Sequence, residues 1–161
     1  MIVDDTSALV SLASVHVLDT VLTEFDVHTT ETVVGELEDT AAYDDRHGDA
    51  AQVVLDSRER LDSHEIAERL ESSRIDRGEG SCALLTRAID AEFLITDDLR
   101  ALPELQTASD AEVAISPIVL KALVERGTIE TGEALEKLDR LAQQRSWLGQ
   151  PIYTRARDLF E

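Results

Sequence analysis

Short apolar runs alternate with longer segments of helical spacing along this chain. Four runs are predicted to be strands because each is brief and is bounded by polar or acidic residues; they span residues 2–5, 26–29, 93–96 and 113–116. Predicted helices fill residues 7–13, 17–25, 50–61, 78–91, 117–126, 131–145 and 151–160, and another begins near residue 30. Strands that alternate with helices predict an α/β fold with a mostly parallel central sheet covered on both faces.

Several local features complete this prediction. Residues 66–70 fit either a strand or a helical turn, and we assign a strand. The polar residues 41–49 are expected to form a mobile loop, and a short acidic turn is expected between residues 96 and 113. Thr6 or Ser7 is the expected cap of the first helix, and Thr30 or Thr32 that of the helix after the second strand. One domain is expected over residues 1–161, its helices from about residue 117 packing on the sheet or forming a dimer face.

Carboxylates follow two of the predicted strands and lie on two of the predicted helices. The acidic residues concerned are Asp4, Asp5, Glu36, Glu79, Asp97 and Asp98. A buried parallel strand delivers the residues after it to the carboxyl edge of the sheet, where open α/β folds place their ligands. Gathered carboxylates repel one another and resist desolvation unless a hard cation neutralises them. The pattern therefore predicts a site for Mg²⁺ or Mn²⁺.

Such a site has a definite chemistry. Asp5 and Asp97 can hold one divalent ion, and Glu36 and Glu79 can contribute directly or through water. The ion would lower the pKa of a bound water, which could then attack a phosphodiester. Neither His nor Cys is needed as a nucleophile.

Three further residues are candidates for substrate binding. Arg100 follows the acidic turn and is expected to contact a phosphate. Ser7 and Thr96 are expected to orient a ligand or the attacking water.

The charge of the chain restricts how it could meet a nucleic acid. The formal net charge is −19, with 34 acidic and 15 basic residues spread along the whole sequence. This distribution is typical of a surface adapted to a salty cytoplasm, where repulsion is screened. A nucleic-acid enzyme with this charge must rely on its few Arg side chains and on bound metal for attraction.

Other residue types argue against several classes of protein. Cys82 is the only cysteine, so the chain has no internal disulfide, and the thiol is expected to be a buried apolar group in a reducing cytoplasm. Asp4 and Asp5 disfavour a signal peptide, and no apolar run approaches the ~20 residues of a membrane helix. The histidines at positions 16, 28, 47 and 64 show no ligand spacing, which argues against a zinc site.

Four segments together resemble the PIN domain family of compact metal-dependent nucleases. They are VDDTSALVSL, TTETVVGELE, GEGSCALLTRAIDAEFLITDD and IVLKALVERGTI. The resemblance covers most of the chain and is closest to a prokaryotic branch with a Gly-Glu pair before its fourth helix. It implies a three-layer α/β/α fold. The family includes the toxin ribonucleases of toxin–antitoxin operons.

The family's acidic residues can be carried over by position. The first falls on Asp5, which is followed by the hydroxyl pair Thr6 and Ser7; the second falls on Glu36 and the third on Glu79. The fourth falls on the pair Asp97 and Asp98, and the count from Glu79 favours Asp97. Glu79 stands where Asp is more common, and the doubled acids leave the roles of Asp4 and Asp98 open.

The resemblance implies a Mg²⁺- or Mn²⁺-dependent endoribonuclease with RNA as its substrate. It also suggests an antitoxin protein as a partner and a homodimer as the assembly. A second interpretation stays open, in which a catalytically inactive PIN-like module binds nucleic acid or protein. A phosphorylation-receiver domain fits poorly because Lys121 lies within a predicted helix instead of at a strand end. A serine hydrolase fits poorly because the sequence has no Gly-x-Ser-x-Gly elbow.

Overall fold

A computed structural model describes all residues from 1 to 161. The chain divides into two compact units, Met1–Ile115 and Ser116–Glu161. The single domain expected over the whole chain stays a prediction, and each unit is described by itself. All the acidic candidate residues lie in the first unit.

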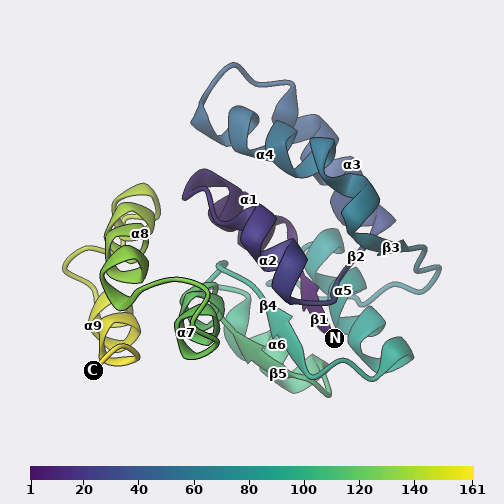
Figure 1. Ribbon diagram of the computed structural model, residues 1–161. Coiled ribbons are helices and arrows are strands. Elements are labelled where there is room, and N and C mark those ends of the chain that lie inside the picture. Colours follow the sequence, from purple (N-terminus) through teal and green to yellow (C-terminus); the bar gives the residue numbers. More distant parts are fainter. The chain divides into compact units, whose positions relative to one another are not determined.

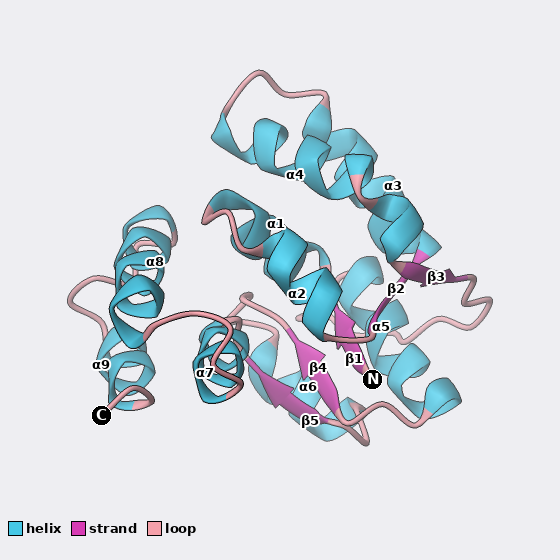
Figure 2. Cartoon of the chain, viewed as in Figure 1, coloured by secondary structure: helices cyan, strands magenta, loops and turns pink.

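The first unit is built on a five-stranded parallel sheet (Figures 1 and 2). Its strands are β1 (Ile2–Asp4), β2 (Val27–Thr30), β3 (Asp62–His64), β4 (Phe93–Ile95) and β5 (Glu112–Ala114), in the order β3-β2-β1-β4-β5. Every neighbouring pair is parallel. The predicted mostly parallel sheet is confirmed.

Six helices connect these strands. They are α1 (Thr6–Ser14), α2 (Leu18–Glu24), α3 (Glu31–Ala41), α4 (Arg46–Asp56), α5 (Arg77–Ile89) and α6 (Leu102–Ala108). The strand order reverses direction at β1, and right-handed crossovers then place α1 to α4 on one face and α5 and α6 on the other. Figure 1 shows α1 and α2 on the opposite side of the strands from α5. The predicted three-layer α/β/α fold is confirmed.

Aliphatic side chains form the interior of this unit. Val3, Leu9, Leu37, Leu85 and Leu94 are all within 1% of full burial. They come from a strand or helix of each layer, and burying each such side chain contributes about 1.5–3 kcal/mol to folding. Cys82 is fully buried as expected. The interior therefore needs few aromatic residues.

Side-chain caps fix where the helices begin at the carboxyl edge of the sheet. Asp5 caps α1 by accepting a hydrogen bond from the Ala8 amide at 2.9 Å, so the prediction of Thr6 or Ser7 was wrong. Thr30 caps α3 by accepting from the Val33 amide at 3.1 Å, as one of the two expected residues. Asp76 caps α5. Asp5 and Asp76 therefore stand at helix starts because their carboxylates accept hydrogen bonds from the free amides of the first turn.

Three segments differ from the sequence prediction. The expected strand at residues 66–70 is irregular, and the strand is β3, whose three polar residues occupy the sheet edge. An edge strand with exposed side chains has no apolar run by which to recognise it. Most of the expected loop at 41–49 is helical, because Asp45 caps α4 and leaves a short connection at residues 42–45. The expected acidic turn contains α6, which has Pro103 in its first turn.

The second unit contains three helices. They are α7 (Pro117–Glu125), α8 (Thr131–Gln144) and α9 (Pro151–Asp158), close to the predicted ranges. Helix α7 contacts α8, and α8 contacts α9. Gly127 and Gly149 have φ angles of 73° and 80°, which explains why glycine follows α7 and precedes α9.

No single helix of the chain is long and apolar enough to cross a membrane. Helices α1 and α2 pass that length and composition test only when counted as a pair, and the break between them bends by 116°.

Candidate functional site

The candidate site lies where β1 and β4 end side by side. These strands are neighbours, with Asp4 paired to Ile95, and the chain leaves them toward opposite faces of the sheet. Asp5 follows β1, and Asp97 and Asp98 follow β4. This is the switch point at which open α/β folds form a crevice for ligands.

Ser7 joins the two strand ends. Its hydroxyl donates to Oδ1 of Asp5 at 2.7 Å and accepts a hydrogen bond from the Asp97 amide at 2.8 Å. The Thr96 hydroxyl lies 3.4 Å from the hydroxyl oxygen of Ser7. Ser7 and Thr96 therefore fix how the Asp5 and Asp97 segments face one another.

Asp5 is almost fully buried, and its second carboxylate oxygen, Oδ2, has no hydrogen-bond partner. Burial, together with the nearby Asp97, raises the pKa of Asp5 to about 7, although hydrogen bonds to its carboxylate oppose the change. Oδ1 of Asp5 is thus held by the start of α1, while its Oδ2 has no hydrogen-bond partner.

Asp4 is the most unusual member of the acidic group. It is fully buried, and neither carboxylate oxygen has a hydrogen-bond partner. Burial raises its pKa well above the usual value, and the charges of Asp5 and Asp97 raise it further. An ionised carboxylate in this setting is costly unless a cation or a proton compensates it.

Glu36 approaches from α3 on a neighbouring part of the same edge. Its carboxylate accepts a hydrogen bond from the Thr6 hydroxyl and lies against Gly78 at the start of α5. A Cβ at position 78 would lie 2.1 Å from Oε1 of Glu36, so glycine is needed for this approach. Burial and the nearby Asp76 raise the pKa of Glu36.

Glu79 and Asp98 form a second acidic pair. Glu79 Oε2 accepts from the Asp76 amide at 3.0 Å, and Asp76 Oδ1 accepts from the Glu79 amide at 2.8 Å, which is a capping box. Burial and a hydrogen bond to Asp98 raise the pKa of Glu79. Asp98 is thus a hydrogen-bond partner of Glu79, whereas the charge of Asp97 acts on Asp4 and Asp5.

These residues fit a hard divalent cation. Buried carboxylate oxygens without partners, at Asp4 and Asp5, are the ligand type that Mg²⁺ and Mn²⁺ prefer. Asp4 and Asp5 are adjacent and lie within the electrostatic reach of Asp97, whereas Glu79 is hydrogen-bonded to Asp98. A cation beside the first group would offset the repulsion among its charges.

A cavity of about 620 Å³ opens beside the second acidic pair. Glu79 and Asp98 line it together with Arg74 and Arg100. Arg100 lies 3.7 Å from Asp98, and its side chain is 93% exposed, so it can turn toward a ligand. Arg74 makes a similarly long contact of 3.7 Å with Glu104.

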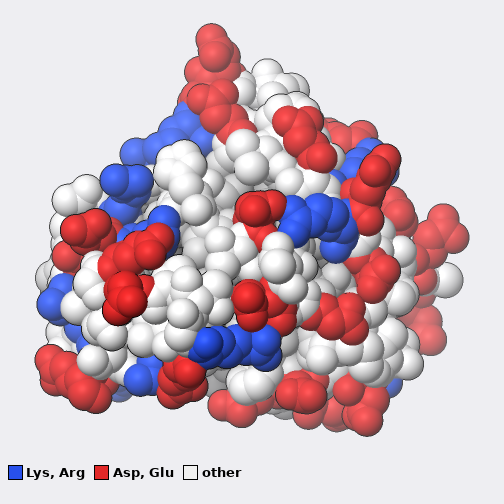
Figure 3. Space-filling model, in the orientation of Figure 1, with Lys and Arg blue, Asp and Glu red and all other residues white.

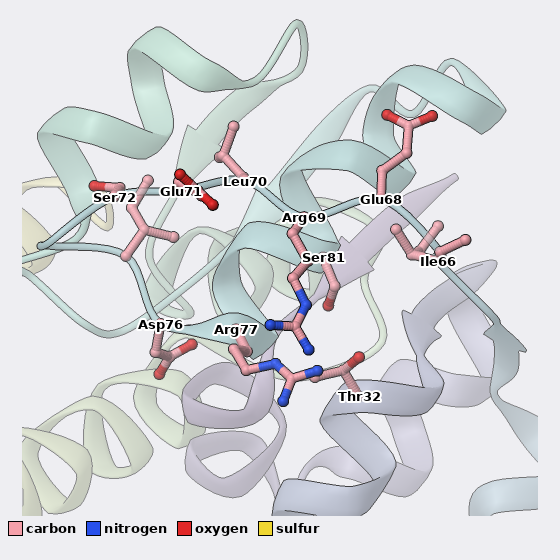
Figure 4. Close-up of a pocket in the computed structure, with 12 residues that line it drawn as sticks. Thr32, Ile66, Glu68, Arg69, Leu70, Glu71, Ser72, Asp76, Arg77 and Ser81 are labelled. Atoms are coloured by element: carbon pink, nitrogen blue, oxygen red, sulfur yellow. The ribbon is translucent and has the colours of Figure 1, made fainter.

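A second cavity, of about 440 Å³, shares Ile75 and Asp76 with the first. Figure 4 shows Arg69 and Arg77 extending into it near Thr32. Neither arginine forms an ion pair, although acidic side chains are scattered over the face shown in Figure 3. Glu68, Glu71 and Asp76 line the same cavity, so the two guanidinium groups supply only a local positive charge beside Thr32.

Comparison with protein families supplies the decisive observation. A family model described as a PIN domain matches residues 1–161, the whole chain. The chain belongs to the PIN domain family. No curated protein matches the sequence. PIN domains are generally nucleases and usually use divalent metals, which agrees with the acidic group of this PIN domain.

Sequence reasoning missed some residues that shape the site of this PIN domain. Asp76, which positions Glu79, could have been recognised from its place three residues before Glu79 in a capping box. Arg69 and Arg77 gave no signal, because Arg69 lies within the irregular segment at residues 65–76, Arg77 directly follows it, and the two line one cavity only in the tertiary structure. Asp4 was left open, and its complete burial makes it a member of the group.

Replacing Asp4 by Asn is expected to stabilise the PIN domain in EDTA. The substitution removes a buried charge that has no partner. At pH 8 this should raise the free energy of unfolding by about 1–3 kcal/mol and the Tm by about 2–12 °C. The folded-state pKa of Asp4 is raised, so the cost of Asp4 is absent at low pH and develops as pH rises above the unfolded pKa. The gain should therefore shrink at pH 4. Thermal unfolding at both pH values, with the exposed Asp44→Asn as control, measures it, and a lower Tm at pH 8 would contradict it.

Proposed function

We propose that this PIN domain is a metal-dependent endoribonuclease that hydrolyses RNA phosphodiester bonds. The observation that supports it most is the set of buried carboxylate oxygens without partners at the switch point. An acidic pocket would repel RNA, but four arginines line the two cavities beside it. Carboxylates for a cation and guanidinium groups for phosphates suit phosphodiester chemistry.

In this proposal Asp5 and Asp97 hold Mg²⁺ or Mn²⁺, with Asp4 adjacent and Glu36, Glu79 and Asp98 around them. When bound, the cation would activate a water and offset charge on the phosphate. Ser7 keeps the two aspartates in register by bonding to both segments. It acts as a positioning residue, and Thr96 supports it.

The arginines that line the two cavities, within and beside the irregular segment at residues 65–76, would bind the RNA backbone. Arg100 and Arg74 are placed for a phosphate beside Glu79 and Asp98. Arg69 and Arg77 are placed for a phosphate further along the strand. Planar guanidinium groups bind phosphate in a bidentate manner, so a few arginines can locally outweigh an acidic surface.

A binding module without catalysis is the second candidate. It is favoured by the capping box, because the Glu79 carboxylate already has a structural partner in the Asp76 amide. The orphaned oxygens of Asp4 and Asp5 weigh against it, since a module without metal has no use for them. An antitoxin partner and a homodimer stay predictions from the family.

Cleavage of RNA is the direct test. In roughly molar KCl with Mn²⁺, the wild type should cut mixed single-stranded and structured RNA, and EDTA should abolish cutting. Asp5→Asn should lower the rate by about 100-fold or more, since even a partner of a metal ligand typically contributes 10–100-fold. The control is Asp44→Asn, an exposed aspartate in the connection after α3, which should cut normally.

The outcomes separate the two functions. If wild-type protein binds RNA without cutting it, and Asp5→Asn binds equally well, the recognition module is correct. If Asp5→Asn cuts as fast as the wild type, the proposed site is wrong.

The arginine pair should govern RNA affinity without supplying chemistry. Arg69→Ala with Arg77→Ala is expected to raise KM and leave kcat within about twofold. It should also reduce the slope of log affinity against log salt by about 1.4, because two contacts to single-stranded RNA are lost. Binding measured over a salt series checks this. Arg58→Ala, which lies before β3 at the opposite end of the strand, should change neither quantity; an equal loss there would indicate nonspecific attraction.

A further inference from the structure

A second group of metal-ligand residues lies at the opposite end of the sheet, on β2 and β3. His28 pairs in register with Asp62, and Thr30 pairs with His64. Side chains two residues apart in a strand share a face, so His28, Asp62 and His64 project together. Asp26 precedes β2 and brings a carboxylate to the same place. The sheet thus assembles residues that lie far apart in sequence.

His28 is the centre of this group. Its side chain is only 9% exposed, while those of Asp26 and Asp62 are 56% and 67% exposed. Nε2 of His28 lies 3.0 Å from Oδ1 of Asp26 and 3.6 Å from Oδ2 of Asp62. Nε2 makes no well-aligned hydrogen bond, and the two carboxylates beside it are its only partners; the contact with His28 lowers the pKa of Asp26. One imidazole nitrogen and two carboxylates that converge in this way form a set of donors for a metal ion.

The other ring nitrogen of His28 is already engaged. Nδ1 of His28 lies 2.9 Å from Nε2 of His64, and the two rings stack with centroids 5.2 Å apart. If Nδ1–H of His28 donates to His64, Nε2 keeps its lone pair and faces the two carboxylates. Metal-binding histidines characteristically have their second nitrogen fixed in this way.

The spacing of the three donor atoms suits a small tetrahedral ion. Zinc bonds of about 2.0–2.1 Å to nitrogen and oxygen place neighbouring ligands about 3.4 Å apart. The distances of 3.0 and 3.6 Å from Nε2 fall on either side of that value, and all three donor atoms lie within 4.8 Å of one another. One imidazole with two carboxylates favours Zn²⁺ over Mg²⁺, which prefers oxygen alone.

We propose that Asp26, His28 and Asp62 bind Zn²⁺ or a similar transition-metal ion, with His64 orienting His28. Solvent would supply the remaining ligand, because both carboxylates are exposed. The ion would link β3, a short edge strand with exposed side chains, to β2. It is separate from the acidic site, because Asp26 and Asp62 lie at the amino ends of strands whereas Asp5 and Asp97 follow carboxyl ends.

A competing arrangement uses the same contacts without metal. A doubly protonated His28 would form ion pairs with Asp26 and Asp62 and donate to His64. The N-terminal ammonium group also acts on Asp26 and would compete with a cation. The two arrangements differ in whether a stoichiometric transition metal binds.

Co²⁺ is the probe that separates them, since it reports tetrahedral ligation by visible absorption. We expect wild-type protein in high KCl, which suppresses diffuse binding to its acidic surface, to bind one Co²⁺ with an intense visible band that Zn²⁺ displaces. Asp5→Asn should retain the band, because the site is at the other end of the sheet. Asp26→Asn with Asp62→Asn should lose it, and exposure of both residues means the variant should still fold.

Two further variants sharpen the result. His64→Gln should weaken Co²⁺ binding about 10–100-fold while keeping the band, as expected for a partner of a ligand. The exposed Asp44→Asn should bind normally. The proposal is overturned if wild-type protein shows no Co²⁺ band, which would leave the ion pairs alone, or if the band survives in the Asp26 and Asp62 double variant. Neither result bears on RNA cleavage in Mn²⁺.

Discussion

The burial of carboxylates at the ends of β1 and β4 is the constraint on which the rest of the site depends. Asp4 and Asp5 are taken out of water by the packing of the sheet, and three of their oxygens have no partner. Folding alone does not favour that arrangement, because desolvation and mutual repulsion both oppose it. The hydrogen bonds of Ser7 and the cap of α1 hold the group in place without neutralising it. A cation bound beside these carboxylates would offset their repulsion and would therefore stabilise the folded state.

The acidic surface is compatible with the proposed RNA substrate because of where the arginines lie. The net charge of −19 would repel RNA over most of the surface, and Figure 3 shows acidic side chains spread over the face in view. Arginines nevertheless line both cavities beside the acidic group, and two of them have no acidic partner. A phosphate chain needs attraction only where it contacts the protein, and high salt screens the remainder within a few ångströms. For RNA binding, the positions of a few arginine side chains therefore matter more than the net charge of the protein.

The sequence predicted many elements well and some poorly, for identifiable reasons. The helices after β1 and β3 and the strands β1 and β4 have buried apolar faces, and these produce a readable period. The edge strand β3 consists of Asp62, Ser63 and His64, so its pairing comes from backbone hydrogen bonds to β2 and leaves no apolar pattern. Helix α6 was missed because a prolyl residue and a short length resemble a turn.

Order along the chain determined which carboxylates follow strands, and hence that Asp5 and the Asp97–Asp98 pair reach one edge of a parallel sheet. The periods of the apolar residues also determined the layered α/β architecture. Only the tertiary structure decided how the members divide: the charge of Asp97 acts on Asp4 and Asp5, while Asp98 is hydrogen-bonded to Glu79. It alone brought His28 to His64, which looked unrelated in the sequence because they are 36 residues apart. The local sequence determines which strand or helix a residue follows. The neighbours of its side chain are determined by strand register and burial, which depend on segments that are distant along the chain.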